Sequence, residues 1–354
     1  MRLSYVPRVV FVSVFWCASI CGAQIPTDPS EMYGAWCASC HALDGTGLVE
    51  VPTVTVEPMD FTDCAVTTSE PDADWELVIA HGGPIAGLSS QMPGYGDTLS
   101  SEQIQVLVGY VRSFCDEPGW PIGNLNFSRP IFTEKAFPEN EVVIVPSVSH
   151  KADGGTDLRL RTVYERRIGR RGHAEIGIPV QSLVDGSRRT SGFGDFTVAG
   201  KHVLHTNEAS SRILSGGLEV KFPTGSELSG LGGGTTVFEP YLSSGVSVRD
   251  LIIQGQVKLE LPVGGASDEL EFVYNLYAGK DLSGLPSTWT VGAELNGVSD
   301  RLAITPQIRK GITRTGAIAI ALGVRIPILN RQRQHVQGVG YLIWEYLDPI
   351  RAAP

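Results

Sequence analysis

Basic residues are almost absent from the first third of the chain. Between residues 24 and 125 there are 15 Asp and Glu residues and one basic residue, Arg112, whereas residues 126–354 contain 23 acidic and 25 basic residues. The first segment therefore has a net charge of −14 and the second a net charge of +2. A strongly acidic surface repels nucleic acid and attracts basic proteins. We expect basic partners for this segment and no nucleic acid.

Long apolar runs are also scarce. Arg2 and Arg8 accompany the apolar run from Val9 to Ile20, and the small residues of Cys21-Gly22-Ala23 follow it. This order predicts a secretory signal peptide over residues 1–23, and the apolar run is too short to span a bilayer comfortably. A lipid-modified Cys21 is the alternative. No other segment is apolar for long enough to form a transmembrane helix, so any crossing of a membrane would need strands.

The common catalytic motifs are missing. The sequence has no Walker loop, no dinucleotide fingerprint and no nucleophile motif. Four of its histidines lack the carboxylate or cysteine neighbours at the spacing that a metal site needs; they are His150, His202, His205 and His335. These motifs therefore give no support for a catalyst of the corresponding classes.

Cysteines are few, but two of them form a motif. Cys37-Ala38-Ser39-Cys40-His41 has the Cys-x-x-Cys-His spacing of c-type haem attachment. Two thiols one helical turn apart can each add to a haem vinyl group, which brings the adjacent imidazole under the iron. A thioredoxin-like redox pair would need a surrounding βαβ pattern, and a zinc site would need a second cysteine pair. The motif predicts one covalently attached haem c, with His41 as the proximal iron ligand.

Two further cysteines remain after removal of the signal peptide, Cys64 and Cys115. In an oxidising compartment an even pair favours a disulfide over two free thiols. The bridge would close a loop of about 50 residues and would stabilise the fold by about 4 kcal/mol in the chain-entropy description. We predict a disulfide between Cys64 and Cys115.

The second axial ligand of the haem iron is predicted to be Met92. It lies in the loop Gln91-Met92-Pro93-Gly94-Tyr95-Gly96, which precedes a helix with Ser100 and Gln103 as a capping box. A loop fixed to such a helix can hold a weak thioether ligand. The rival ligands are Met32, Met59 and His81. Two more helices are expected, one from Glu31 with Ser30 as its N-cap and one over residues 73–81 that ends at Gly82-Gly83.

The haem motif and the segment around Met92 together resemble the small class I cytochromes c. The resemblance rests on Tyr33 to Gly47 and on residues 92–112, and it covers about residues 26–116. It implies haem attachment at Cys37 and Cys40, His41 as proximal ligand and Met92 as distal ligand. Iron with six ligands has no free position for a substrate, so the resemblance implies electron transfer.

After about residue 140 the sequence changes to alternating apolar and polar residues. Between residues 212 and 223, for example, Leu214 and Leu218 alternate with Ser215 and Glu219. Strict alternation indicates strands with one apolar face and one polar face. About twelve such runs occur, near residues 141–148, 156–167, 173–181, 193–205, 212–223, 236–248, 250–262, 268–279, 287–297, 301–310, 315–328 and 336–347. Their length suits tilted transmembrane strands around a polar lumen, whereas a soluble β-sandwich would have shorter strands.

Three short motifs add a second resemblance. Gly192-Phe193-Gly194-Asp195, Leu218 to Gly225 and Phe238-Glu239-Pro240-Tyr241-Leu242 resemble the outer-membrane barrels of the meta-pathway phenol-degradation family, over about residues 130–347. The resemblance implies a barrel and passage of a small solute. A cluster of four arginines could dock the acidic haem domain or a lipid headgroup, or could form a solvated turn; it comprises Arg166, Arg167, Arg170 and Arg171.

The chain is thus predicted to have four parts. They are a signal peptide (1–23), an all-α cytochrome c domain (24–116), a linker (117–138) and an antiparallel outer-membrane β-barrel of about twelve strands (139–354). The predicted function is haem c electron transfer by a protein anchored in the outer membrane of a Gram-negative-type bacterium, with the cytochrome in the periplasm. The alternatives are a solute channel with a redox-sensing or redox-coupled cytochrome, and a soluble periplasmic oxidoreductase.

Overall fold

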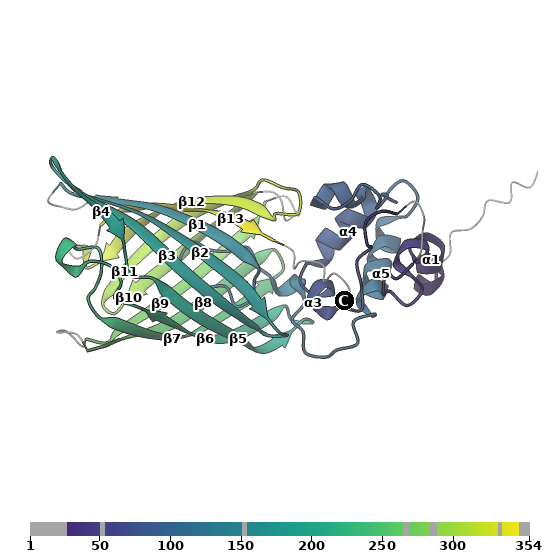
Figure 1. Cartoon of the computed structure of the whole chain (residues 1–354), viewed down its shortest axis with the longest axis horizontal. Coiled ribbons are helices and arrows are strands. Elements are labelled where there is room, and N and C mark those ends of the chain that lie inside the picture. The colour runs from purple at the N-terminus through teal and green to yellow at the C-terminus, as the bar shows by residue number, and fades with distance from the viewer. Residues whose placement is uncertain are drawn as a thin grey trace, which may run out of the picture.

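The chain folds into a helical domain at one end of a β-barrel (Figure 1). The structure is a computed structural model that describes residues 27–49, 54–150, 154–264, 269–282, 289–331 and 335–346. The predicted signal peptide, residues 1–23, lies outside the described residues.

Five short α-helices occur in the described part of the helical domain. They are α1 (Pro29–Trp36), α2 (Ala38–His41), α3 (Cys64–Thr67), α4 (Asp72–His81) and α5 (Ser101–Arg112), with the 3₁₀ turn η1 (Gly83–Ala86) after α4. The predicted capping box is confirmed, because Ser100 and Gln103 each bond the other's backbone at the start of α5. The apolar face of α5 packs against α1, where Met32 and Tyr33 are buried. One small core therefore holds α1 and α5 together.

The predicted start of α1 is wrong by two residues. Asp28, not Ser30, is the N-cap, and its carboxylate accepts from the backbone N–H groups of Ser30 and Glu31 at 3.0 and 3.1 Å. Pro29 can occupy the first helical position because that residue has no N–H to satisfy. Helix α4 begins one residue earlier than expected and ends at His81, followed by Gly82 as its C-cap, whose φ of 83° suits glycine.

Thirteen strands of the described residues form one antiparallel sheet. They are β1 (Glu141–His150), β2 (Thr156–Ile168), β3 (Gly172–Asp185), β4 (Arg188–Phe193), β5 (Thr197–Asn207), β6 (Arg212–Lys221), β7 (Thr236–Val248), β8 (Leu251–Val263), β9 (Glu271–Asp281), β10 (Trp289–Val298), β11 (Arg301–Gly311), β12 (Ile318–Leu329) and β13 (Gln337–Glu345). Strand β1 pairs with both β2 and β13, and β2 pairs with β3, so the sheet closes on itself.

Strands β4 and β5 are two parts of one interrupted strand. Both pair with β3, β5 along Gly172–Gly177 and β4 along Val180–Asp185. The barrel therefore has twelve strand positions, which confirms the expected number. The alternation pattern did not predict β4, because residues 188–192 contain no alternating apolar residues.

The two faces of the barrel wall differ in chemistry as predicted. In β6 and β8 the side chains of Leu214, Leu218 and Val257 are exposed on the outside, while Ser215 and Gln254 are buried inside. Exposed aromatic residues lie near both rims. Strand order and register place Tyr164, Trp289 and Trp344 at the rim beside the helical domain, and Phe193, Phe238 and Phe272 toward the opposite rim. An apolar wall between two aromatic belts is typical of a barrel in a bilayer.

The chain between the two domains lies inside the barrel. The backbone N–H of Thr133 donates to Glu294 of β10 at 2.7 Å, and Lys201 of β5 donates to the carbonyl of Lys135 at 2.6 Å. Tyr341 of β13 donates to the carbonyl of Arg129 at 2.6 Å. Only a segment within the lumen can reach strands on different sides of a closed barrel. We call residues 121–140 the luminal segment; the sequence had indicated only a linker over residues 117–138.

Candidate functional site

The haem motif sits where α1 passes into α2. Cys37 caps both helices, and its carbonyl accepts from the backbone N–H groups of Cys40 and His41 at 3.1 and 2.9 Å. Both thiols are free and half-buried. This single turn presents two thiols and an imidazole on one short helix, as covalent haem attachment requires.

His41 is oriented by a backbone carbonyl. Its Nδ1 lies 3.3 Å from the carbonyl oxygen of Met59, and its ring stacks on Phe61 with 4.4 Å between centroids. A proton on Nδ1 would donate to this carbonyl and leave the lone pair of Nε2 for a metal. Burial lowers the pKa of His41, which favours the neutral imidazole that metal ligation needs.

The loop that carries Met92 is tied to the helices around it. The Met92 carbonyl accepts from the N–H of Gly83 at 3.0 Å, and a Cβ on Gly82 would lie 2.8 Å from the same oxygen. Tyr95 Oη donates to the carbonyl of Trp36 at 2.8 Å and so links this loop to α1 beside Cys37. The loop is therefore held in place by close backbone packing, and Met92 itself is half-buried.

The rival ligands lie in different surroundings. Met32 is buried in the helical core with 1% of its surface exposed, and His81 is exposed at the end of α4. Met59 packs partly buried on the same core. The choice of Met92 as distal ligand stays a prediction.

Two buried indole groups fit the presence of a haem. The Nε1 atoms of Trp36 and Trp75 are buried and have no hydrogen-bond partner among the described residues. A buried donor without an acceptor is costly, so such groups call for a partner. Haem brings two propionate groups, which accept hydrogen bonds. The residues present thus suit haem, which when bound supplies one-electron oxidation and reduction.

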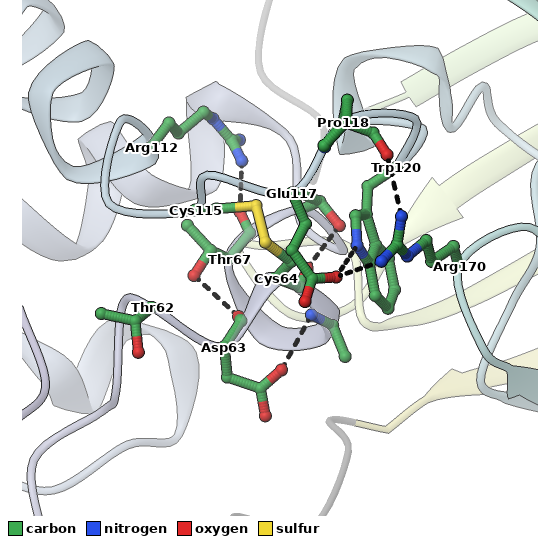
Figure 2. Close-up of a disulfide and its surroundings, with 12 residues drawn as sticks. Thr62, Asp63, Cys64, Thr67, Arg112, Cys115, Glu117, Pro118, Trp120 and Arg170 are labelled. Carbon is green, nitrogen blue, oxygen red and sulfur yellow. Dashed lines mark hydrogen bonds and ion pairs between the residues drawn. A yellow bond between two sulfur atoms is a disulfide. The ribbon is translucent and has the colours of Figure 1, made fainter.

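The predicted disulfide is present. Cys64 of α3 and Cys115 after α5 are joined across 51 residues, with 5.1 Å between their Cα atoms (Figure 2). Beside it the guanidinium of Arg112 donates to the carbonyls of Thr67 and Glu70 and pairs with the carboxylate of Asp72. The single basic residue of the helical domain thus fixes α5 to the segment that leads into α4.

The arginine cluster contacts the chain that leaves the helical domain. Arg170 pairs with Glu117 at 3.2 Å, and Arg171 donates to the carbonyl of Gly119 at 2.7 Å (Figure 2 shows Arg170). Arg167 lies over the ring of Trp120 at 5.6 Å. These contacts are with residues 117–120, which belong to the predicted linker between the haem domain and the barrel.

A group of carboxyl groups at the junction of the two domains was not found from the sequence. Burial raises the pKa of Asp74 to about 8, and the nearby carboxylates of Glu70 and Glu345 add to the effect. Burial likewise raises the pKa of Glu70 to about 7, with Glu345 and Glu139 adding to it and Arg167 opposing it. A small polar cavity lies here between the helical domain, the luminal segment and the barrel rim.

Four residues inside the barrel have side chains that could together bind a metal ion. Single donor atoms of Glu134, Glu165, His173 and Glu175 lie within 4.8 Å of one another. Each carboxylate, however, is already paired with a cationic side chain. The pairs are Glu134 with Lys201 at 2.9 Å, Glu165 with Arg129 at 2.7 Å and Glu175 with Arg161 at 3.0 Å. We therefore interpret the cluster as an ion-pair network that holds Arg129 and Glu134 of the luminal segment.

Comparisons with known proteins agree with the helical domain. Residues 24–111 match the family described as "Cytochrome C oxidase, cbb3-type, subunit III". The N-terminal part of the chain is therefore a cytochrome c domain, as predicted, and this family implies haem. No curated protein sequence matches the chain.

Solved barrels resemble the second domain. One is the COG4313 outer membrane channel from Pseudomonas putida F1, with 15% identity and a TM-score of 0.44, covering 62% of this chain and 100% of that one. Another is the KdgM porin, with 9% identity and a TM-score of 0.42, covering 58% of this chain and 99% of that one. Among the described residues, no helix combines the length and apolar character needed to cross a membrane.

Proposed function

We propose that this protein is a haem c electron carrier that its barrel anchors in the outer membrane. The observation that carries the proposal is the pairing of a haem-attachment turn on a small helical domain with a closed barrel whose lumen is occupied by residues 121–140. A lumen filled by the protein's own chain suits an anchor better than an open pore. The axial ligands are His41 and Met92, and haem is bound through Cys37 and Cys40.

The barrel topology supports a periplasmic position for the haem domain. Glu141 at the start of β1 pairs with Glu345 at the end of β13. The chain therefore enters the first strand and leaves the last strand of the barrel at the same rim. The luminal segment leads from that rim to the helical domain. In outer-membrane barrels with an even strand number, both chain ends face the periplasm. The cytochrome would there exchange electrons with soluble basic proteins.

The apolar outer wall argues against a soluble oxidoreductase. The outward side chains of Leu160, Ile178, Leu242 and Leu322 are between 43% and 63% exposed, and each lies on a different strand of the barrel. Such a band would aggregate in water but is stable against lipid. A channel remains the second candidate function, on the observation that polar side chains line the lumen.

Membrane fractionation tests the proposal. The full chain is expressed with its signal peptide and a haem-attachment system, and the inner membrane, outer membrane and soluble periplasm are separated. We expect covalent haem to be found with the outer membrane and to be reduced by a basic soluble cytochrome added from the periplasmic side. Recovery of the haem protein in the periplasm without detergent would refute the anchor. Membrane-bound haem that no periplasmic donor can reduce would refute the electron-carrier function.

A further inference from the structure

The luminal segment is held mainly by polar groups where it runs deepest. The carboxylate of Glu294 accepts from three successive backbone N–H groups, those of Ile131, Phe132 and Thr133, at 2.7–3.0 Å, and from the Thr133 hydroxyl at 2.6 Å. Glu294 is completely buried. A chain without regular secondary structure is thus fixed by one side chain of the wall.

Charged pairs hold the rest of the segment. Arg129 lies between Glu141 of β1 and Glu165 of β2, and Glu134 pairs with Lys201 of β5. All of these groups bind water well, so they would be hydrated if the segment left the lumen. Apolar packing occurs in two places. Leu125, Phe127 and Phe137 join a small buried cluster nearer the helical domain, and Ile131 packs on a second buried cluster that includes Tyr341 and Ile343. Most of the deep contacts are nevertheless polar, which suits a segment that can leave and return.

The helical domain binds the beginning of the luminal segment through hydrogen bonds and close packing. The side-chain amide of Asn124 accepts from the backbone N–H of Asp72 at 2.8 Å and donates to its carboxylate at 2.7 Å. Gly123 packs so closely on the backbone of Glu70 that a Cβ there would overlap it. Arg112 in turn binds Asp72 and the Glu70 carbonyl, which ties this contact to α5.

Two of the contacts between the rim and the chain before the luminal segment are made by Arg170 and Arg171, whereas Arg167, which lies over the ring of Trp120, is buried. In the pair of Arg170 with Glu117, the side chains are 53% and 55% exposed. Arg171 donates to the backbone carbonyl of Gly119. Exposed ion pairs contribute little and weaken with salt. A force on the helical domain would therefore release these rim contacts before it separated the domain from Asn124.

We infer that residues 121–140 are a removable plug and that movement of the haem domain away from the rim withdraws this plug from the lumen. When the domain leaves the rim, Asn124 and Gly123 move with it and the contacts at Glu294 and Lys201 are exchanged for water. The barrel then becomes a pore for small hydrophilic solutes. This activity goes beyond electron transfer, and a failure of the inference would leave the electron-carrier proposal intact.

Liposome swelling with arabinose tests the plug on the full-length holoprotein. Glu294→Ala removes the acceptor of three N–H groups, while Glu260→Ala is the matched control, because Glu260 also lines the lumen but pairs with Lys258 of its own strand. We expect swelling at least tenfold faster for Glu294→Ala than for the wild type or the control. Heat-modifiable migration on gels and an unchanged haem spectrum verify that each variant is folded.

Trypsin gives a second measurement of the same event. Lys135 is 2% exposed inside the barrel, so cleavage after it reports that the segment has left. We expect Lys135 to be cut in Glu294→Ala and protected in the wild type and the control. The inference of a plug would be overturned if liposomes with the wild-type protein swelled as fast as liposomes with Glu294→Ala. A variant that is cut at Lys135 but stays impermeable would also overturn it.

The coupling to the haem domain is tested at the rim. Arg170→Ala with Arg171→Ala removes the contacts with Glu117 and Gly119, which weakens the attachment at the rim, and we expect at least threefold more swelling and cleavage at Lys135. The same two arginine substitutions in an Asn124→Ala background should increase swelling and cleavage only a little. Without the Asn124 contact, the released residues 116–123 can extend, so the domain can move without pulling on the plug. Equal increases in swelling and cleavage with and without Asn124→Ala would show that the haem domain does not withdraw the plug.

Discussion

Asn124 and Asp72 form a two-way hydrogen-bonded pair across 52 residues of sequence, with the Asn124 amide both accepting from the Asp72 N–H and donating to its carboxylate. The pair connects the first turn of a cytochrome helix to the chain that fills the barrel. The haem domain is therefore joined to the barrel through the lumen as well as at the rim.

The first prediction concerns the distal iron ligand. Replacing Met92 with Ala should abolish the sulfur-to-iron charge-transfer band and lower the reduction potential, because a thioether ligand stabilises ferrous haem. Met59→Leu is the control, since the backbone carbonyl that orients His41 remains. Visible spectra and a redox titration of the purified holoprotein provide the measurement. Persistence of the band in Met92→Ala would assign the ligand elsewhere.

The disulfide should stabilise the haem domain substantially. Cys64→Ser with Cys115→Ser removes a cross-link that closes 51 residues. In the chain-entropy description the loss is on the order of 4 kcal/mol. Guanidinium unfolding of the full chain, followed by the haem absorbance, measures it. Wild-type protein treated with a reductant is the control and should fall to the same midpoint; an unchanged midpoint in both samples would mean that the bridge constrains little.

The buried carboxyl group of Asp74 should make the domain less stable as the pH rises. Its pKa is raised from the ordinary value of 3.8 to about 8, so the folded state holds a proton that the unfolded state releases. Stability should therefore fall between about pH 4 and pH 8 and level off above this range. Asp74→Asn should remove most of this slope and stabilise the domain at pH 8 by on the order of 2–5 kcal/mol.

Haem-detected unfolding between pH 5 and pH 9 checks this prediction. Asp97→Asn, an exposed site in the same domain, is the matched control and should retain the wild-type slope. Part of the slope should survive in Asp74→Asn, because Glu70 has its pKa raised to about 7. Parallel wild-type and Asp74→Asn curves would show that Asp74 is hydrated in the folded protein.

Electron exchange should depend steeply on salt. The haem domain is strongly acidic, so a basic soluble cytochrome is attracted at low ionic strength, and salt screens this attraction over about 8–10 Å. We expect stopped-flow exchange with a basic cytochrome to slow as salt rises, and exchange with an acidic one to quicken. Rates indifferent to ionic strength would locate the acidic residues away from the haem edge.

The sequence alone determined the features that depend on neighbours along the chain. The haem turn from Cys37 to His41 needs one helical turn, and the start of α5 needs Ser100 and Gln103 three residues apart. The alternation of residues such as Leu214 and Ser215 is a local property of a strand with two different faces. The cysteine count predicted the bridge from Cys64 to Cys115, because only two cysteines were left to pair.

Only the tertiary structure decided how the barrel interior is used. The contact of Thr133 with Glu294 joins residues 161 apart, and that of Tyr341 with Arg129 joins residues 212 apart. Neither contact has a local period, since each exists only because strand pairing closes the barrel around the segment. The same holds for Asp74, whose pKa is raised by burial at a domain junction. A stretch that resembles a plain linker in sequence becomes the filling of the lumen because a closed barrel gathers partners from opposite walls.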